Sequence, residues 1–451
     1  MKAKHWIVIG GGVKGIVGAY LLSKNNNKVT LIDRAKHIGG VLRSEKWDAF
    51  YMDKGCHLFD NESDLTTKLA LEIMDNEVVP VNVKYASYVN NKKTSGIAIP
   101  NIGSFSDEIC KNILWESLNM IKAPKNNPES LFEYISSIHG ETVAEILDAF
   151  IKKTHVISSK DVDPMSFNLL PYKRIKFLDD KIGRVLKQSA YLDEKIAISS
   201  MGNLMEFYKE KAKRYKHRNF YPAKSGLTLF CDKSYEKLLN LNVDFKLNQG
   251  PFKINFGKKG VDLIFDSSEE TISGDHILWA GSQEYLGDTF GIENDLKNFV
   301  HSVPMILYYF QVDKKSICDY SYIHNFNSDD YTFRVSFPTN YNKKLYPGND
   351  AIICVEVPVK LNSEIWKTPD LFTNKIWREL GELDLIKAHK YKKVKILQTP
   401  VSYKIPKKGY SNEIKKITKM LPKDIVYGAS EWEYSKNGII NSVYNIIKNN
   451  G

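Results

Sequence analysis

The stretch Ile7-Val-Ile-Gly-Gly-Gly-Val-Lys-Gly15 decides the fold of this chain. The apolar run Ile7–Ile9 is typical of a buried parallel strand, and Gly10, Gly12 and Gly15 follow at the spacing of a G-x-G-x-x-G turn. In such a turn the first glycine lets the chain reverse and the second lets backbone N–H groups approach a pyrophosphate. The third lets the next helix, expected over residues 13–23, pack on the strand, with its positive N-terminal end toward the phosphates.

A second apolar run, Val29–Ile32, ends in Asp33, eighteen residues after Gly15. A carboxylate at this position can accept hydrogen bonds from the hydroxyls of an adenosine ribose. Glycine-rich turns are common, so the alternative is an α/β turn that binds no nucleotide. Here the turn lies between a strand and a helix, and a second strand ending in an acid follows, which favours a dinucleotide site. We include Arg34, which follows the acid, in this predicted site.

The segment Gly39-Gly-Val-Leu-Arg-Ser44 narrows the choice of dinucleotide. A second glycine pair shortly after the ribose acid resembles the FAD-binding segment of the flavin amine oxidase, protoporphyrinogen oxidase and UDP-galactopyranose mutase families. The resemblance implies FAD as the cofactor and implies contacts to it from Gly39, Gly40, Leu42 and Arg43. Taken alone, the glycine pair would be a plain loop and Arg43 a solvated charge.

The length and composition indicate a globular protein with two or three hydrophobic cores. The chain has 451 residues, of which 43% are hydrophobic and 12% aromatic. The first strand begins almost at Met1 and no apolar run reaches the roughly 18 residues of a membrane span, so we expect a cytoplasmic protein. The five scattered cysteines include no C-x-x-C pair, so neither a disulfide framework nor a metal site is expected.

The net charge of +11 leaves several partners open. Dispersed lysines favour a solvated surface; the alternatives are steering of an anionic substrate or cofactor, and peripheral contact with an acidic membrane surface. We expect no nucleic-acid partner, because no recognised nucleic-acid module is present.

The pattern along the chain predicts an α/β protein with two domains. We expect a discontinuous Rossmann-type FAD-binding domain over residues 1–90, 200–295 and 400–451. The second is a substrate domain over residues 91–199 and 296–399, of α+β class, with helices and a mainly antiparallel sheet. Its first part resembles the helical insertion of protoporphyrinogen oxidase-like flavoproteins, with Gly140 expected to end a helix.

Two further segments extend the resemblance to the same flavoproteins. Phe220-Tyr-Pro-Ala-Lys-Ser-Gly226 resembles the Y-P-x-x-G turn that returns those chains to the FAD domain. Near the C-terminus, Gly428 and then Asn437, Gly438 and Ile439 resemble a strand end and a helix N-terminus that face the flavin pyrimidine ring. The chain departs from many members of the group at Ala429, where an arginine often follows the glycine, and this weakens any implied phosphate contact there.

Few residues are candidates for catalysis or substrate binding, and each of them could instead have a purely structural role. His57, in the Gly55-x-His57 loop, resembles a residue that lies against the flavin in mutase-like members. The alternative is a loop histidine that forms a structural hydrogen bond. Arg334, expected on a strand of the substrate domain, is a candidate for binding an anionic substrate group. The alternative is an arginine that forms a surface ion pair. We place Tyr221, Lys224, Tyr403 and Tyr434 in the substrate site, where packing is the alternative for the tyrosines.

The function expected from this resemblance is FAD-dependent oxidation of a small molecule, by hydride transfer to flavin N5. A second hypothesis is isomerisation of a nucleotide sugar, as in UDP-galactopyranose mutase, where reduced flavin is the nucleophile and no net redox change occurs. A third is a non-catalytic FAD-binding protein. The redox state of flavin needed for turnover distinguishes the first two, and the intact glycines of both segments count against the third.

Overall fold

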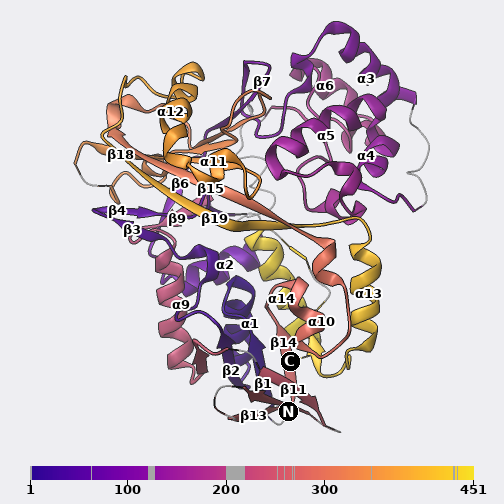
Figure 1. Ribbon diagram of the computed structural model, residues 1–451, viewed down its shortest axis with the longest axis vertical. Helices are drawn as coiled ribbons and strands as arrows, with labels where there is room; N and C mark the ends of the chain where they lie inside the picture. The colour runs from indigo at the N-terminus through magenta and orange to yellow at the C-terminus, as the bar shows by residue number, and fades with distance from the viewer. Residues whose placement is uncertain are drawn as a thin grey trace. The chain divides into compact units, whose positions relative to one another are not determined.

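The computed structural model describes residues 3–61, 63–119, 127–199, 219–250, 252–257, 260–266, 268, 270–346, 348–429, 432–433 and 435–450 (Figure 1). The chain forms two compact units. Unit 1 is drawn from residues 1–81, 208–299 and 412–451, and unit 2 from residues 82–207 and 300–411. Among the described helices, none combines the length and the apolar character needed to cross a bilayer.

Unit 1 is organised around a five-stranded parallel sheet in the order β10-β2-β1-β14-β20. Its strands are β1 His5–Ile9, β2 Lys28–Asp33, β10 Asp244–Leu247, β14 His276–Trp279 and β20 Val426–Tyr427. The central strand β1 has apolar side chains on both faces, at most 6% exposed from Trp6 to Ile9, as expected for a parallel strand covered on both sides. Helix α1, Val13–Lys24, packs against α9 and α14 (Figure 1).

The remaining elements of unit 1 are short sheets and helices around this core. The strands are β3 Glu45–Trp47, β4 Phe50–Met52, β5 Phe59–Asp60, β6 Val78–Val81, β9 Asn219–Pro222, β11 Phe252–Phe256, β12 Val261–Phe265 and β13 Thr271–Gly274. The helices are α2 Asp64–Ile73, α9 Thr228–Asn240, α10 Leu286–Thr289 and α14 Lys436–Asn450, with α13 Tyr410–Met420 beginning at the unit boundary.

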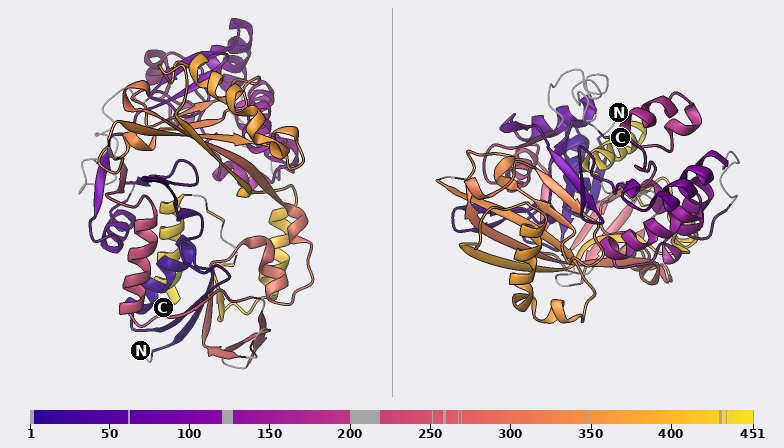
Figure 2. Two further views of the ribbon diagram at one scale, coloured as in Figure 1. Left: turned by 60° about the vertical axis from the view of Figure 1, so that its left-hand side comes forward. Right: turned by 90° about the horizontal axis from the view of Figure 1, so that it is seen from above.

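Unit 2 contains a seven-stranded sheet in the order β19-β15-β18-β17-β16-β7-β8, antiparallel except between β16 and β7. The strands are β7 Tyr85–Val89, β8 Lys92–Ser95, β15 Val300–Asp313, β16 Tyr322–Asn325, β17 Arg334–Ser336, β18 Asp350–Pro358 and β19 Lys393–Pro406. Helices α11, Glu364–Lys367, and α12, Thr373–Glu382, pack on one face and share a hydrophobic core with alternate strand residues (Figure 2). The predicted mainly antiparallel sheet is confirmed.

A second core of unit 2 lies among its helices. These are α3 Asp107–Asn119, α4 Leu131–His139, α5 Glu141–His155, α6 Asp180–Leu186 and α7 Ala190–Asp193. Ser130 caps α4 by accepting a hydrogen bond from the Glu133 N–H, and Gly140, at φ 100°, ends it as predicted. Ile135 of α4 and Leu147 of α5 are buried in the shared core.

The predicted domain boundaries differ in places from those of the two units. Residues 82–90 and 400–411, predicted to belong to the FAD domain, lie in unit 2, because β7 pairs with β16 and β19 pairs with β15 of that unit. Residues 296–299, predicted to belong to the substrate domain, lie in unit 1. The predicted boundary at residue 200 lies outside the described residues.

Candidate cofactor site

The three glycines of the first turn have different surroundings. Gly10, at φ +111°, donates its N–H to the carbonyl of Ile32 at 2.8 Å, and a Cβ on it would lie 2.6 Å from the oxygen of Ala280. A Cβ on Gly15 would lie 1.7 Å from the oxygen of Gly10, so helix and strand approach too closely for any side chain there. A Cβ on Gly12, the N-cap of α1, would have no atom within 4 Å. Open space at a helix N-terminus is where an anionic group can meet backbone N–H groups.

Asp33 lies at the carboxyl end of β2, beside this turn. Its Oδ2 accepts the N–H of Gly11 at 2.5 Å, and its Oδ1 accepts the N–H of Ala35 at 2.7 Å. These two bonds hold the carboxylate in one orientation and leave lone pairs on both oxygens, since each carboxylate oxygen can accept more than one hydrogen bond.

Gly10, Gly12, Asp33 and Arg34 line a single cavity of about 550 Å³ within unit 1. The other wall is formed by the last residue of β14 and by residues that follow β10 and β14 in the chain: Trp279, Gln249, Gly250, Phe252, Ala280, Gly281, Ser282, Tyr285, Asp288 and Thr289. The guanidinium of Arg34 lies over the ring of Tyr285, 5.3 Å from its centroid.

Trp279 supplies a test of whether this cavity fits a ligand. Its side chain is 2% exposed, and its indole Nε1–H has no acceptor among the described residues. Buried polar groups of native proteins are normally hydrogen-bonded, so an orphaned donor in a cavity wall fits a ligand acceptor. With the open glycine turn and the fixed carboxylate, the residues present fit an adenosine diphosphate moiety.

The second glycine pair lies directly against the first turn. Gly39 donates its N–H to the carbonyl of Gly11 at 2.7 Å, and a Cβ on Gly40 would lie 3.6 Å from the Cα of Gly12. Gly39 has φ +116°, and a Cβ there would collide with the Cys231 sulfur at 2.3 Å. The structure therefore brings the two glycine segments together, although 24 positions separate Gly39 from Gly15.

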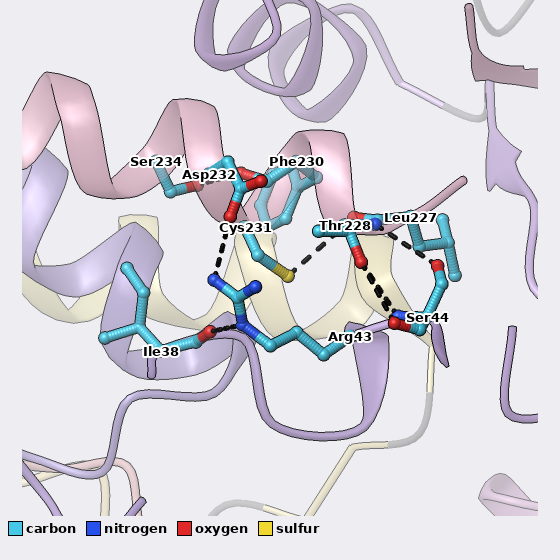
Figure 3. Close-up of polar contacts among 9 residues, drawn as sticks. All are labelled: Ile38, Arg43, Ser44, Leu227, Thr228, Phe230, Cys231, Asp232 and Ser234. Carbon is cyan, nitrogen blue, oxygen red and sulfur yellow. Dashed lines mark hydrogen bonds and ion pairs between the residues drawn. The ribbon is translucent and has the colours of Figure 1, made fainter. Parts of the chain in front are cut away.

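Arg43 anchors the second glycine segment to α9 (Figure 3). Its Nε donates to the carbonyl of Ile38 at 3.0 Å, and its Nη2 lies 2.8 Å from Oδ1 of Asp232. Next to it, Ser44 and Thr228 exchange hydrogen bonds, the Ser44 N–H donating to Thr228 Oγ1 at 3.0 Å. The side chain of Arg43 thus holds the loop, and that of Leu42 is buried beside it, 2% exposed.

Asp53 is a residue that sequence reasoning missed. Its side chain is buried and accepts hydrogen bonds from the Ser44 hydroxyl at 2.5 Å, from the Tyr221 hydroxyl, and from the Leu227 N–H at 3.2 Å. Burial raises the pKa of this carboxyl, and the hydrogen bonds from Ser44 and Tyr221 oppose that shift. Asp53 therefore joins the second glycine segment, the Tyr221 turn and the start of α9. The only sequence signal was an isolated acid two residues before Gly55.

The C-terminal candidates lie at the edge of the sheet and at the start of α14. The carbonyl of Gly428 accepts a hydrogen bond from Lys14 Nζ at 2.6 Å, which links α1 to the end of β20. Ser435 caps α14, because its hydroxyl accepts the Gly438 N–H at 2.8 Å and its carbonyl accepts the Ile439 N–H at 3.0 Å. Asn437 donates its side-chain N–H to the carbonyl of Asp60 at 3.1 Å. Lys14 was the second residue that the sequence reasoning missed.

Of the predicted site residues that the structure describes, only Gly10, Gly12, Asp33 and Arg34 are among the residues that line this cavity. The His57 Nε2 lies 3.1 Å from the carbonyl of Lys54, within its own loop. Lys224 forms an exposed ion pair with Glu77 at 2.5 Å. In unit 2 the hydroxyl of Tyr403 donates to the carbonyl of Thr154 at 2.7 Å. Tyr434 lies outside the described residues.

Arg334 is held in a bidentate ion pair on the sheet of unit 2. Its Nε and Nη2 each lie 2.6 Å from an oxygen of Glu356, the residue directly opposite on β18. The Glu356 side chain is 3% exposed and the Arg334 side chain 27%. The pair is thus partly buried, and any anionic group bound by Arg334 would share it with Glu356.

Comparisons with known proteins agree with this geometry. A family model described as an NAD(P)-binding Rossmann-like domain matches residues 8–70. A putative L-amino-acid oxidase of Bacillus subtilis is 24% identical over 279 residues, which are 58% of this chain and 51% of that protein. Coproporphyrinogen III oxidase of Staphylococcus aureus is 22% identical over 307 residues, which are 63% of this chain and 62% of that protein.

Solved structures share the fold over nearly the whole chain. A reduced UDP-galactopyranose mutase superposes with a TM-score of 0.73 at 14% identity, covering 99% of this chain and 93% of the mutase. A putative protoporphyrinogen oxidase from Exiguobacterium sp. 255-15 superposes with a TM-score of 0.68 at 13% identity, covering 100% and 99%. The chain has the fold of the FAD-dependent oxidoreductase-like group.

The resemblance inferred from the glycine segments is thereby confirmed at the level of this group. The matched region spans between half and two thirds of the two oxidases above. A flavin or nucleotide cofactor agrees with both the Rossmann-like domain and the flavoenzyme neighbours.

Proposed function

We propose that this protein binds FAD non-covalently and oxidises a small molecule by hydride transfer to the flavin. The observation that carries the proposal is the cavity in which the open position at Gly12 and the fixed carboxylate of Asp33 lie together. FMN lacks the adenosine and the second phosphate that this cavity fits. The names of the two relatives, an amino-acid oxidase and a coproporphyrinogen oxidase, support oxidation as the reaction class.

The residues of the chain supply binding and orientation. When bound, FAD supplies the redox chemistry by accepting a hydride at N5. The turn at Gly12 and the N-terminus of α1 would hold the pyrophosphate, and Asp33 would accept the ribose hydroxyls. Arg43 and Asp53 keep the second glycine segment in place beside that turn. In unit 2 we propose Arg334, shared with Glu356, as a contact for an anionic substrate group.

The second candidate function is isomerisation of a nucleotide sugar without net redox change. The Gly55-x-His57 loop favours it by resemblance to mutase-like members, and Ala429 counts against it because an arginine often follows the glycine in the group. The two functions require different redox states of the bound flavin at the start of turnover.

The proposal is tested with purified protein. We expect a yellow protein that releases FAD, and not FMN, on denaturation. Anaerobic addition of the true substrate, sought among amino acids, amines and porphyrinogens, should remove the visible flavin absorbance in proportion to the substrate added. Colourless protein that cannot be reconstituted with FAD would contradict the cofactor assignment. Turnover of a nucleotide sugar only after chemical reduction would replace the oxidase with the mutase.

A further inference from the structure

Lys14 lies in the first turn of α1, the helix that follows the first glycine turn. The N-terminal end of a helix carries partial positive charge, so a cation there is disfavoured by about 0.3–1 kcal/mol, whereas an acid or a bound anion is favoured. The first turn of α1 contains no acid that would offset this charge. A residue that departs from such a local preference is expected where a function requires it.

The ammonium of Lys14 is held at the carboxyl edge of the parallel sheet. Its Nζ donates to the carbonyl of Gly428, directly after β20, at 2.6 Å. A Cβ on Gly428 would lie 3.1 Å from this nitrogen and 3.0 Å from the carbonyl oxygen of Trp279, the last residue of β14. Trp279 lines the cofactor cavity. The ammonium therefore lies near the cavity, at the edge of the sheet where α/β proteins bind their ligands.

Gly428 suits this contact because it has no side chain. Its φ of +77° favours glycine, and the position of a Cβ would crowd the Lys14 nitrogen. In the group that this chain resembles, an arginine often follows the glycine, whereas this chain has Ala429. Lys14 thus brings a cation to the same glycine from a distant part of the chain.

We propose that Lys14 supplies a cation for the cofactor phosphates, in place of an arginine after Gly428. This inference rests on the proposed function, because it concerns the adenosine diphosphate moiety assigned to the cavity. Lysine acts as a point charge that suits phosphate, and its charge adds to that of the backbone N–H groups at the start of α1. The hydrogen bond to Gly428 already orders the side chain, so less conformational freedom is lost when the phosphates bind.

The test is competition of ADP and of adenosine with FAD in the full-length protein, followed by FAD fluorescence. The two probes differ only in their phosphates. In Lys14→Met, which keeps the apolar stem and removes the charge, we expect FAD and ADP to bind about tenfold or more weakly and adenosine to change by less than about twofold. Lys14→Gln, a second neutral variant, should show the same selective loss of ADP. Lys14→Arg keeps the charge and should bind ADP within about threefold of the unchanged protein.

The control is Lys24→Met, which removes the same charge from an exposed lysine, paired with Glu72, in the last turn of the same helix. We expect it to bind FAD and ADP like the unchanged protein. Equal ADP affinities of Lys14→Met and Lys24→Met would overturn the inference. So would an equal loss of ADP and adenosine in Lys14→Met, which would make Lys14 a purely structural link between α1 and β20. Both results leave the proposed function standing, whereas an unchanged protein that binds neither FAD nor ADP would overturn that function as well.

Discussion

The two units of this protein bury different ionisable groups. In unit 1 the buried carboxyl of Asp53 joins three segments next to the cofactor cavity, and burial raises its pKa. In unit 2 the buried groups include two histidines of the helical core. Burial is the main cause that lowers the pKa of His139 to about 4 and that of His155 to about 3.

Asp53 and the two histidines contribute to stability with opposite pH dependence. The native state binds fewer protons at His139 and His155 than the unfolded state, so these two groups lower the stability of unit 2 as the pH falls from about 6.5 toward 4. The native state binds more protons at Asp53, so this group lowers the stability of unit 1 as the pH rises above the ordinary carboxyl range.

The largest effect is expected in unit 1, for Gly12→Val. The new side chain enters open space at the turn, so we expect folded protein whose FAD affinity falls by more than about 100-fold. FAD fluorescence titration and circular dichroism measure the two properties. Gly15→Val is the contrasting variant, because its Cβ would collide with Gly10, and we expect it to destabilise unit 1 by about 3 kcal/mol or more. Normal FAD binding by Gly12→Val would mean that the turn is misassigned.

The next effect is expected in unit 2, for Arg334→Met. This variant leaves the buried Glu356 without its bidentate partner and should destabilise the protein by about 2–3 kcal/mol, less than for a fully buried pair because Arg334 is partly exposed. The double variant Arg334→Met/Glu356→Met should recover part of that loss, since no charge is left unpaired. Chemical denaturation measures both. A single variant as stable as the unchanged protein would show that the pair contributes nothing to unit 2.

Asp33→Ala should affect the cofactor and leave unit 2 unchanged. Loss of hydrogen bonds to a charged group should weaken FAD binding by roughly 1.5–3 kcal/mol. Asp266→Ala, at an exposed carboxylate of the same unit, is the control and should bind FAD normally. Equal affinities of the two variants would place the ribose elsewhere.

The smallest effect concerns the acid response of unit 2. In His139→Leu the protonation difference at this position is removed, so the fall in stability between about pH 6.5 and 4 should become shallower by up to about 1.4 kcal/mol per pH unit. Denaturation at a series of pH values measures the slope. His389→Gln, at an exposed histidine of unit 2, should retain the original slope, and an unchanged slope in His139→Leu would show that His139 takes up protons in the folded state.

The sequence by itself determined the elements of unit 1 around the first turn and the two-part nature of the chain. The glycine spacing predicted the turn and α1, and the continuous apolar runs predicted β1 and β2, because turn conformation and burial pattern depend on adjacent residues. Alternation of apolar residues predicted the antiparallel sheet of unit 2 for the same reason.

Only the tertiary structure decided which side chains meet. Lys14 and Gly428 are 414 positions apart, and Arg43 and Asp232 are 189 apart, so no local pattern could pair them. The ion pair of Arg334 with Glu356 depends on strand register, and the role of Asp53 depends on three segments converging on one carboxyl. Local patterns specify elements through backbone preferences, whereas partners of buried polar groups are fixed only when distant segments pack together.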